Sequence, residues 1–223
     1  MKPHRLLIVG AGAMGRLALE IAMDVPEAER DWEIGGFLDD RPNVLDGYGR
    51  SFGILGDPAT FDFSDTDRVV CAIAAPRVRL EFCKRLASRG AKFVNLIHPT
   101  AIIGRYSKMG LGCIFAHYSL LDTDTSVDSH VIVYPRGIVG HDSTVGEGTL
   151  LAPQAVLCGG CTLGRGIFIG ANATVNENTV IGDYASLASG SVATGHIPAH
   201  AVMMGVPARP IRQWAKLLRM SGS

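Results

Sequence analysis

The sequence places an imidazole directly beside a carboxylate, at His141 and Asp142. A neighbouring carboxylate favours the cationic form of a histidine and so raises its basicity. Such a histidine can accept a proton, and a positioned base contributes typically about 10²–10⁴-fold to a rate. We therefore take this pair as the main candidate for chemistry in the chain.

A second candidate is the glycine turn Gly10-Ala11-Gly12-Ala13-Met14-Gly15, which follows an apolar run and precedes a helical pattern. Asp39 lies further along the chain. This context suits a phosphate or ribose bound at a helix N-terminus. Alone it would suggest NAD, but the region is half the size of a complete dinucleotide fold, which argues against a dehydrogenase.

The first hundred residues predict alternating strands and helices. We expect strands at 6–9, 34–38, 68–74 and 92–97 and helices at 16–23 and 77–88. Alternation with short turns implies a parallel sheet covered by helices. Residues 1–98 therefore form one small Rossmann-like α/β domain.

Residues 99–208 follow a different pattern, with a large apolar residue at every sixth position. These positions are Ile103, Met109, Phe115, Leu121, Val127, Val133, Val139, Val145, Leu151, Leu157, Leu163, Ile169, Val175, Ile181 and Leu187. A period of six is typical of a parallel β-helix with three hexapeptides per triangular coil, which predicts about five coils. The next residue is mostly Gly or Ala, and we expect it to allow left-handed turns at the corners. From 209 to 223 the pattern predicts a C-terminal helix that covers the open end of the prism.

The repeat also predicts how His141 is displayed. It follows Val139 by two positions, in a slot that points outward. One coil is eighteen residues, so Gly159 lies beside His141 on the next coil, where a ligand could approach and a backbone N–H could face a developing oxyanion. An adjacent ladder with the same spacing has small residues at its C-terminal positions. These could leave a shallow track for a ligand, but efficient packing at the corners would explain them equally well. The members of this ladder are Pro135, Pro153, Ala171 and Ser189.

Cys158 and Cys161 have the Cys-x-x-Cys spacing of a metal or redox site, but both fall on ordinary positions of the repeat. We interpret them as structural residues. The other prism histidines share no repeated spacing on one face, so we predict no metal, and in particular no three-histidine zinc site.

Composition excludes several classes of protein. The 223 residues are 47% hydrophobic and 19% charged, which excludes a disordered chain. Lys+Arg and Asp+Glu both number 21, so no basic field favours nucleic acid. No apolar run approaches the roughly 20 residues that span a bilayer, so we expect no membrane insertion. Five cysteines make no disulfide framework, and no signal peptide is visible, so we expect a cytoplasmic protein.

The sequence resembles the NeuD-type sugar acyltransferases, which include bacterial UDP-amino-sugar N-acetyltransferases. The resemblance covers essentially the whole chain. Its motifs are Gly10-Ala11-Gly12-Ala13-Met14-Gly15, Gly36-Phe37-Leu38-Asp39-Asp40, Asn95-Leu96-Ile97-His98-Pro99, Val139-Gly140-His141-Asp142, Val145-Gly146-Glu147 and Gly205-Val206-Pro207-Ala208-Arg209. It implies a left-handed β-helix, a homotrimer, an acyl-CoA donor and a nucleotide-linked sugar acceptor.

The resemblance also implies roles for particular residues. His141 would be the general base, followed by the acid Asp142. Acyl-CoA contacts would fall on Leu150, Ala171 and Ser189. To these the coil spacing adds Gly159 beside the base, and we expect Arg209 either to meet a CoA phosphate or to pair locally. The acceptor pocket would be lined by Gly12, Ala13, Met14, Asp39 and Asp40.

We therefore expect an acetyl-CoA-dependent N-acetyltransferase that acts on the amino group of a nucleotide-linked amino-deoxysugar, by direct transfer and without a metal. Because His141 faces outward, a neighbouring subunit must enclose the site, which favours a homotrimer. O-acetylation of a sugar hydroxyl is the alternative. A non-catalytic β-helix scaffold whose first domain senses a nucleotide is a third possibility.

Overall fold

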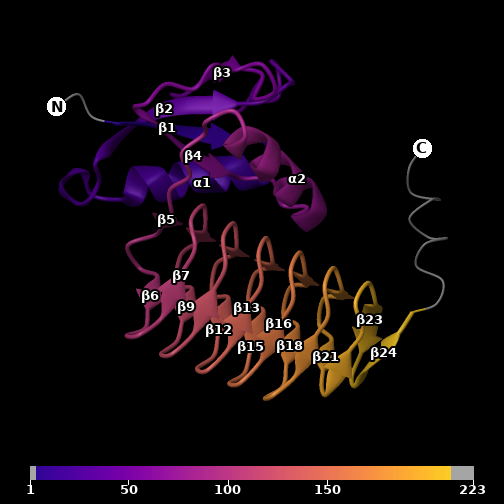
Figure 1. The fold of residues 1–223 in the computed structure, drawn as a ribbon. Coiled ribbons are helices and arrows are strands. Elements are labelled where there is room, and N and C mark those ends of the chain that lie inside the picture. Colours follow the sequence, from indigo (N-terminus) through magenta and orange to yellow (C-terminus); the bar gives the residue numbers. More distant parts are fainter. Residues whose placement is uncertain (1–3, 212–223) are drawn as a thin grey trace.

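The computed structural model describes residues 4–211 and consists of an α/β domain mounted on a triangular prism (Figure 1). The α/β domain has a parallel sheet in the order β3-β2-β1-β4. Its elements are β1 (His4–Val9), α1 (Ala13–Asp24), the 3₁₀ turn η1 (Glu27–Glu29), β2 (Trp32–Leu38), β3 (Ile54–Gly56), β4 (Asp67–Cys71) and α2 (Pro76–Ala87). The predicted strand–helix alternation is confirmed, and only the short edge strand β3 lacked a sequence signal.

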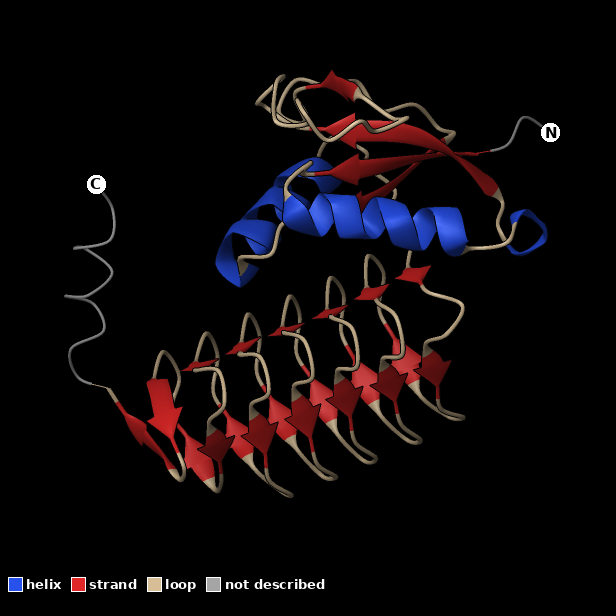
Figure 2. Ribbon diagram, turned by 180° about the vertical axis from the view of Figure 1, so that it is seen from behind, coloured by secondary structure: helices blue, strands red, loops and turns tan. Residues whose placement is uncertain are grey.

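Alternation of side chains along β1 places one helix on each face of the sheet. Leu6 and Ile8 pack with α1, whereas Leu7 and Val9 pack with Cys83 and Leu86 of α2. Figure 2 shows the consequence, with α1 lying between the sheet and the prism.

The expected strand over 92–97 is divided between the two parts of the molecule. Phe93 forms a single parallel bridge with Val69 at the edge of the sheet. Leu96–Ile97 forms β5, which instead pairs with β8 (Ile114–Phe115) of the prism. The prism therefore begins before the expected boundary at residue 99.

The prism is a left-handed parallel β-helix with three faces. Face 1 continues from β5 and β8 with β11 (Ile132–Val133), β14 (Leu150–Leu151), β17 (Phe168–Ile169), β20 (Ser186–Leu187) and β23 (Val202–Gly205). Face 2 contains β6 (Ile102–Ile103), β9 (Leu120–Leu121), β12 (Ile138–Val139), β15 (Val156–Leu157), β18 (Thr174–Val175) and β21 (Val192–Ala193). Face 3 contains β7 (Lys108–Met109), β10 (Ser126–Val127), β13 (Thr144–Val145), β16 (Thr162–Leu163), β19 (Val180–Ile181) and β22 (His196–Ile197). The coils thus continue beyond the fifteen repeat positions at both ends.

The repeat positions form the prism core as predicted. Every one from Phe115 to Leu187 is at most 3% exposed, whereas Ile103 is 39% exposed and Met109 is only partly buried. Both exceptions belong to the first coil, which has no coil before it to cover its core.

The small residues after the repeat positions serve a different purpose from the one expected. The left-handed residue of each corner is two positions further on, as at Asp142 (φ 57°). Gly140 has no positive φ, but a Cβ there would lie 2.7 Å from the Leu157 carbonyl oxygen of the next coil. Close approach of successive coils, rather than backbone handedness, therefore favours small residues at positions such as Gly140.

The chain leaves the prism as a strand, so the prediction of a helix from residue 209 is wrong at its start. Arg209 lies in β24 (Ala208–Pro210), which pairs antiparallel with β23. Hydrogen bonds of this hairpin hold the residues extended. Residues 212–223 of the expected helix lie outside the described residues.

Arg79 of α2 fixes the α/β domain to the prism. Its guanidinium is fully buried and donates to five carbonyl oxygens, at 2.6–3.4 Å. These oxygens belong to Ile73 and Ala74 after β4 and to His130, Gly148 and Thr149 of two successive coils. One side chain thereby ties the edge of the sheet to the prism.

Candidate active site

His141 lies at the corner that joins faces 2 and 3, which we call the 2–3 corner. Its side chain is 58% exposed, which confirms that its slot points outward. The ring Nδ1 lies 2.8 Å from Oδ2 of Asp142. A proton on Nδ1 in this hydrogen bond leaves Nε2 unprotonated and without a hydrogen-bond partner among the described residues, so that it can accept a proton.

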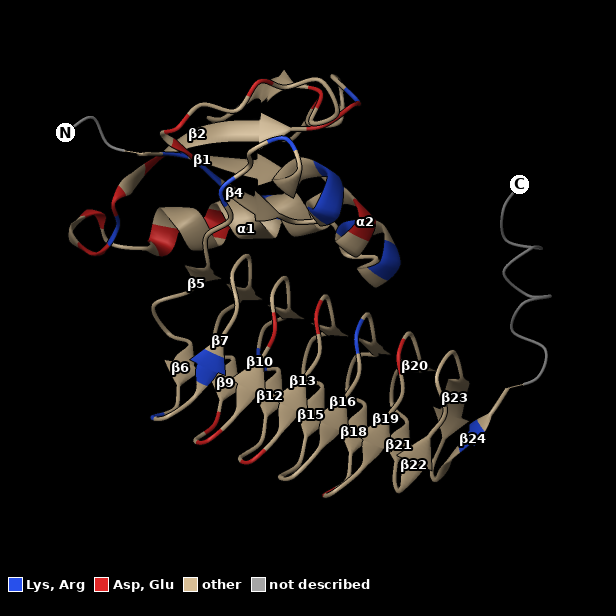
Figure 3. Cartoon of the chain, in the orientation of Figure 1, with Lys and Arg blue, Asp and Glu red and all other residues tan. Residues whose placement is uncertain are grey.

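The charge around His141 increases its basicity. The hydrogen bond with Asp142 is the main cause that raises its pKa; partial desolvation opposes it, and the charges of Asp142, Asp122 and Glu177 add to it. Asp122 and Glu177 lie on the same corner in other coils. Figure 3 shows this acidic row on the loops that hang from the side of the prism facing away from the α/β domain.

Gly159 lies against the imidazole, as the eighteen-residue coil predicted. A Cβ at Gly159 would stand 2.5 Å from Nε2 and 3.0 Å from Nδ1 of His141. The amide of the following residue, Gly160, donates to the His141 carbonyl oxygen at 2.8 Å. The absence of a side chain at Gly159 therefore allows the imidazole to lie against the backbone of the next coil.

The glycine turn forms the N-terminus of α1. Gly12 is the N-cap, and the side chain of Ala13 in the first turn is exposed. No acidic residue occupies this turn, so its free amides are available to an anion. Met14 points the other way and is 4% exposed in the core between α1 and the prism.

The two aspartates after β2 differ in their surroundings. Burial would raise the pKa of Asp39, but hydrogen bonds from the Arg41 side chain and from the Ala11 and Arg41 amides outweigh it and lower that pKa to about 2. Both oxygens of Asp39 are engaged at 2.8–3.0 Å, so this carboxylate holds the glycine turn in place. Asp40 is exposed and is the one available to a ligand.

The ladder of small residues lies at the corner between faces 1 and 2, the 1–2 corner, and not beside His141. Ala171 is partly buried against the core cluster that contains Met14, and Ser189 is exposed. Leu150 is 1% exposed in the same cluster and offers a cofactor no surface in this structure. Arg209 is exposed on β24 at the far end of the prism.

One chain therefore brings the expected residues together in two separate groups. His141, Asp142 and Gly159 share the 2–3 corner. The glycine turn, Ala171 and Ser189 lie near face 1 and the 1–2 corner, across face 2 from His141. The period of six predicted the position of each residue within its repeat. Which of these residues share a corner of the prism became known only from the structure.

The two cysteines of the Cys-x-x-Cys spacing are in surroundings that disfavour thiolates. Burial raises the pKa of both Cys158 and Cys161. The Cys161 thiol points inward and lies 3.2 Å from the Asn176 carbonyl oxygen. Neither feature suits a metal ligand or a redox cysteine, which are favoured by lowered pKa values.

A cluster that sequence reasoning missed joins α1 to the prism. Asp24 accepts from His98 at 3.1 Å and lies 3.4 Å from Nε2 of His117. The Thr100 amide donates to Nδ1 of His98 at 3.0 Å, which places the proton of that ring on Nε2, toward Asp24. A metal would need this nitrogen unprotonated, so the cluster fits a hydrogen-bonded anchor. The sequence gives one indication of this cluster. His117 lies eighteen residues, or one coil, after Pro99, the neighbour of His98.

Neither helix within residues 4–211 combines the length and apolar character needed to cross a bilayer.

Comparison with known proteins matches both parts of the chain. Residues 5–86 match the PglD N-terminal domain, and residues 160–195 match the bacterial transferase hexapeptide (six repeats). None of the curated protein sequences compared with the chain matches it.

Several solved structures are similar over nearly the whole chain. The acetyltransferase domain of PglB from Neisseria gonorrhoeae, in complex with acetyl coenzyme A, is 26% identical, with a TM-score of 0.86 over 94% of this chain and 100% of that one. PerB from Caulobacter crescentus, in complex with CoA and GDP-perosamine, is 23% identical, with a TM-score of 0.83 over 92% and 96%. WeeI from Acinetobacter baumannii is 22% identical, with a TM-score of 0.79 over 92% and 99%. The latter two share the fold.

Proposed function

The chain belongs to the hexapeptide-repeat acyltransferases that carry a PglD N-terminal domain, and from this premise we propose that it transfers an acetyl group from acetyl-CoA to the amino group of a nucleotide-linked amino-deoxysugar. The observation that carries the proposal is the His141–Asp142 pair, with its free Nε2 lying over Gly159. The PglB domain, whose solved complex holds acetyl coenzyme A, supports the choice of donor. The GDP-perosamine bound by PerB, which shares the fold, indicates the class of acceptor to test first.

In the proposed mechanism, Nε2 of His141 takes a proton from the sugar amine as the amine attacks the thioester carbonyl. A C–N bond forms, the C–S bond breaks, and His141 returns the proton to the departing thiolate. Asp142 holds the imidazole through Nδ1 and stabilises its cationic form during transfer. The acetyl group passes directly to the amine, so no residue of the chain is acylated.

We assign the acceptor to the glycine turn and the acyl-CoA to the prism corners. The free amides after Gly12 would hold a phosphate, and Asp40 would reach the nucleotide. The surface at the partly buried Ala171 and the exposed Ser189 would accommodate the pantetheine arm, and Arg209 would meet a phosphate of CoA. Asp39 would act indirectly, by positioning the turn.

The separation of these two groups in one chain favours a site built from two chains of a trimer. The outward residues of face 2 are mostly apolar and partly exposed: Ile102, Leu120, Ile138, Val156, Thr174 and Val192. Those of face 3 are mostly polar: Lys108, Ser126, Thr144, Thr162, Val180 and His196. An apolar face flanked by both groups is suited to contact with another copy, which would bring its neighbour's His141 to this chain's acceptor pocket.

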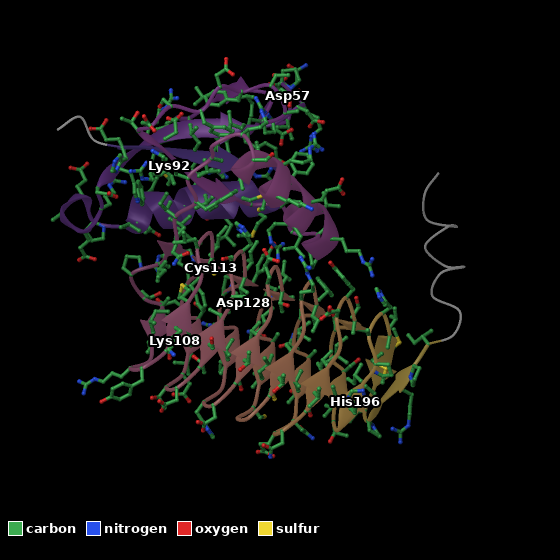
Figure 4. All side chains as sticks on the ribbon, in the orientation of Figure 1. Asp57, Lys92, Lys108, Cys113, Asp128 and His196 are labelled. Carbon is green, nitrogen blue, oxygen red and sulfur yellow. The ribbon has the colours of Figure 1, made fainter. Side chains whose placement is uncertain are left out.

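Release of CoA thiol in the presence of acetyl-CoA and a panel of nucleotide-linked sugars tests the proposal. Amino-deoxysugars should support turnover, and the matching hydroxy sugars should not. Replacement of His141 by Ala should reduce kcat by at least about 10²-fold. His196→Ala is the matched control, because this exposed histidine lies on face 3 at the far end of the prism (Figure 4). Full turnover by His141→Ala, or turnover of the hydroxy sugars alone, would contradict the proposal.

A further inference from the structure

A groove of about 740 Å³ separates α2 from the third corner of the prism, the 3–1 corner. Its helix side includes Arg77, Glu81 and Lys84, and its prism side includes His130, Arg165 and Tyr184. None of these residues belongs to the proposed active site, which uses the other two corners.

Two glycines form a notch in the prism side of this groove. Successive coils place His130, Gly148, Gly166 and Tyr184 in one column, each with a positive φ. A Cβ at Gly148 would lie 2.5 Å from Leu80 of α2, and one at Gly166 would lie 2.6 Å from the ring of Tyr184. The absence of side chains at the two glycines makes room for Leu80 of α2 and for the ring of Tyr184. His130 and Tyr184, which flank the glycines in the column, form the two ends of the notch.

His130 lines this groove and has its Nδ1 turned against Gly112 of the preceding coil. The residue is 8% exposed, and its Nδ1 is buried without a hydrogen-bond partner among residues 4–211. Burial first, and then the charge of Arg79, lower its pKa to about 4, so the ring is neutral at neutral pH. An enclosed Nδ1 without an acceptor favours the tautomer with its proton on Nε2. His130 therefore offers one N–H donor and lacks a protein acceptor for it among the described residues.

Three cationic side chains line the same groove, those of Arg77, Lys84 and Arg165. Arg165 pairs with Glu147 at 2.9 Å, and Arg77 lies 4.3 Å from the ring centroid of Tyr184 and bonds to His200 at 2.7 Å. Lys84 has no carboxylate within 4.0 Å in the part of the chain that is described. Glu81, between Arg77 and Lys84 on the helix, is the second carboxylate of the groove. Three cations thus face two carboxylates, one of which is already paired.

We propose that this groove binds a phosphate-bearing anion, held by Lys84, the Nε2–H of His130 and the guanidinium of Arg165. Tetrahedral phosphate oxygens can accept from several converging donors at once, and charge-assisted hydrogen bonds of this type are the strong ones. A neutral histidine donor in addition to two cations suits such a ligand, because it adds a hydrogen bond without further charge. The site is separate from acyl transfer and does not depend on the proposed function.

Binding of inorganic pyrophosphate to the full chain tests this site by calorimetry and by NMR of ¹⁵N-labelled histidine. We expect a binding event that shifts the Nε2–H signal of His130, apart from any binding at the glycine turn, and Lys84→Ala should weaken this event at least about fivefold. Arg85→Ala is the matched control, since Arg85 leaves the same helix toward Phe82 and not into the groove.

Saturating CoA should leave this binding in place, because the proposed cofactor residues lie on other corners. The inference is overturned if pyrophosphate does not bind, if Lys84→Ala and Arg85→Ala weaken it equally, or if CoA displaces it. Each variant changes an exposed residue of α2, so folding should not obscure the result.

Discussion

The imidazole of His141 lies against the backbone of Gly159, one coil further along the prism. A Cβ at Gly159 would stand 2.5 Å from the nitrogen that we propose accepts the proton. The position of the His141 ring therefore depends on the absence of a side chain at Gly159.

Gly159→Ala should therefore reduce kcat at least about tenfold, because the added methyl group displaces the ring. The ring is exposed and can move, so the melting temperature should change little. Gly53→Ala is a suitable control, because its Cβ would meet no atom within 4 Å and its φ is not positive. Unchanged kcat in Gly159→Ala would show that the ring position at this contact is irrelevant to the reaction.

Asp142→Asn should move the pH profile of kcat/KM. Asp142 raises the pKa of His141, and the base works only when unprotonated, so activity rises as pH passes upward through that pKa. Loss of the carboxylate lowers the pKa, and the rising limb should shift to lower pH while the plateau falls. Asp124→Asn, on the same corner, should leave the limb in place. A shift to higher pH in Asp142→Asn would contradict the assigned role.

Arg79→Met should destabilise the fold. Five carbonyl oxygens would lose their buried donor, and we expect the free energy of unfolding to fall by about 3 kcal/mol or more. Arg85→Met, on the exposed side of the same helix, should stay within about 0.5 kcal/mol of the wild type. Urea denaturation followed by circular dichroism measures both, and equal stability of the two variants would rule out Arg79 as the main tie between the domains.

Leu120→Arg should disrupt the trimer. Leu120 points outward from the apolar face 2, and Ser126 is its counterpart on the next strand of the polar face 3. Light scattering should give about three times the 23.7 kDa chain mass for the wild type and for Ser126→Arg. Leu120→Arg should give a folded monomer without activity. A monomeric wild type would contradict the two-chain site.

The period of six predicted the prism, its core and the exposure of His141, because burial repeats with the coil. It did not predict the purpose of residues such as Gly140, since close approach between coils and backbone handedness favour the same small residues. The role of Arg79 was equally hidden, because its acceptors are backbone oxygens, which carry no sequence signal. The placement of His141 and Ser189 on different corners depended on where each coil turns. The position of Arg209 in a strand reflects pairing with β23, which outweighed the local helical pattern.

Recovery of activity on mixing two inactive variants tests the central claim most directly, that His141 of one chain serves the acceptor pocket of another. His141→Ala lacks the base, and Ala13→Trp fills the exposed first turn of α1 at the proposed acceptor site. Random mixed trimers, formed by refolding both chains together, should regain about a quarter of wild-type activity, because one site in four combines both intact halves. No recovery in confirmed mixed trimers would place the whole site within a single chain and contradict this account.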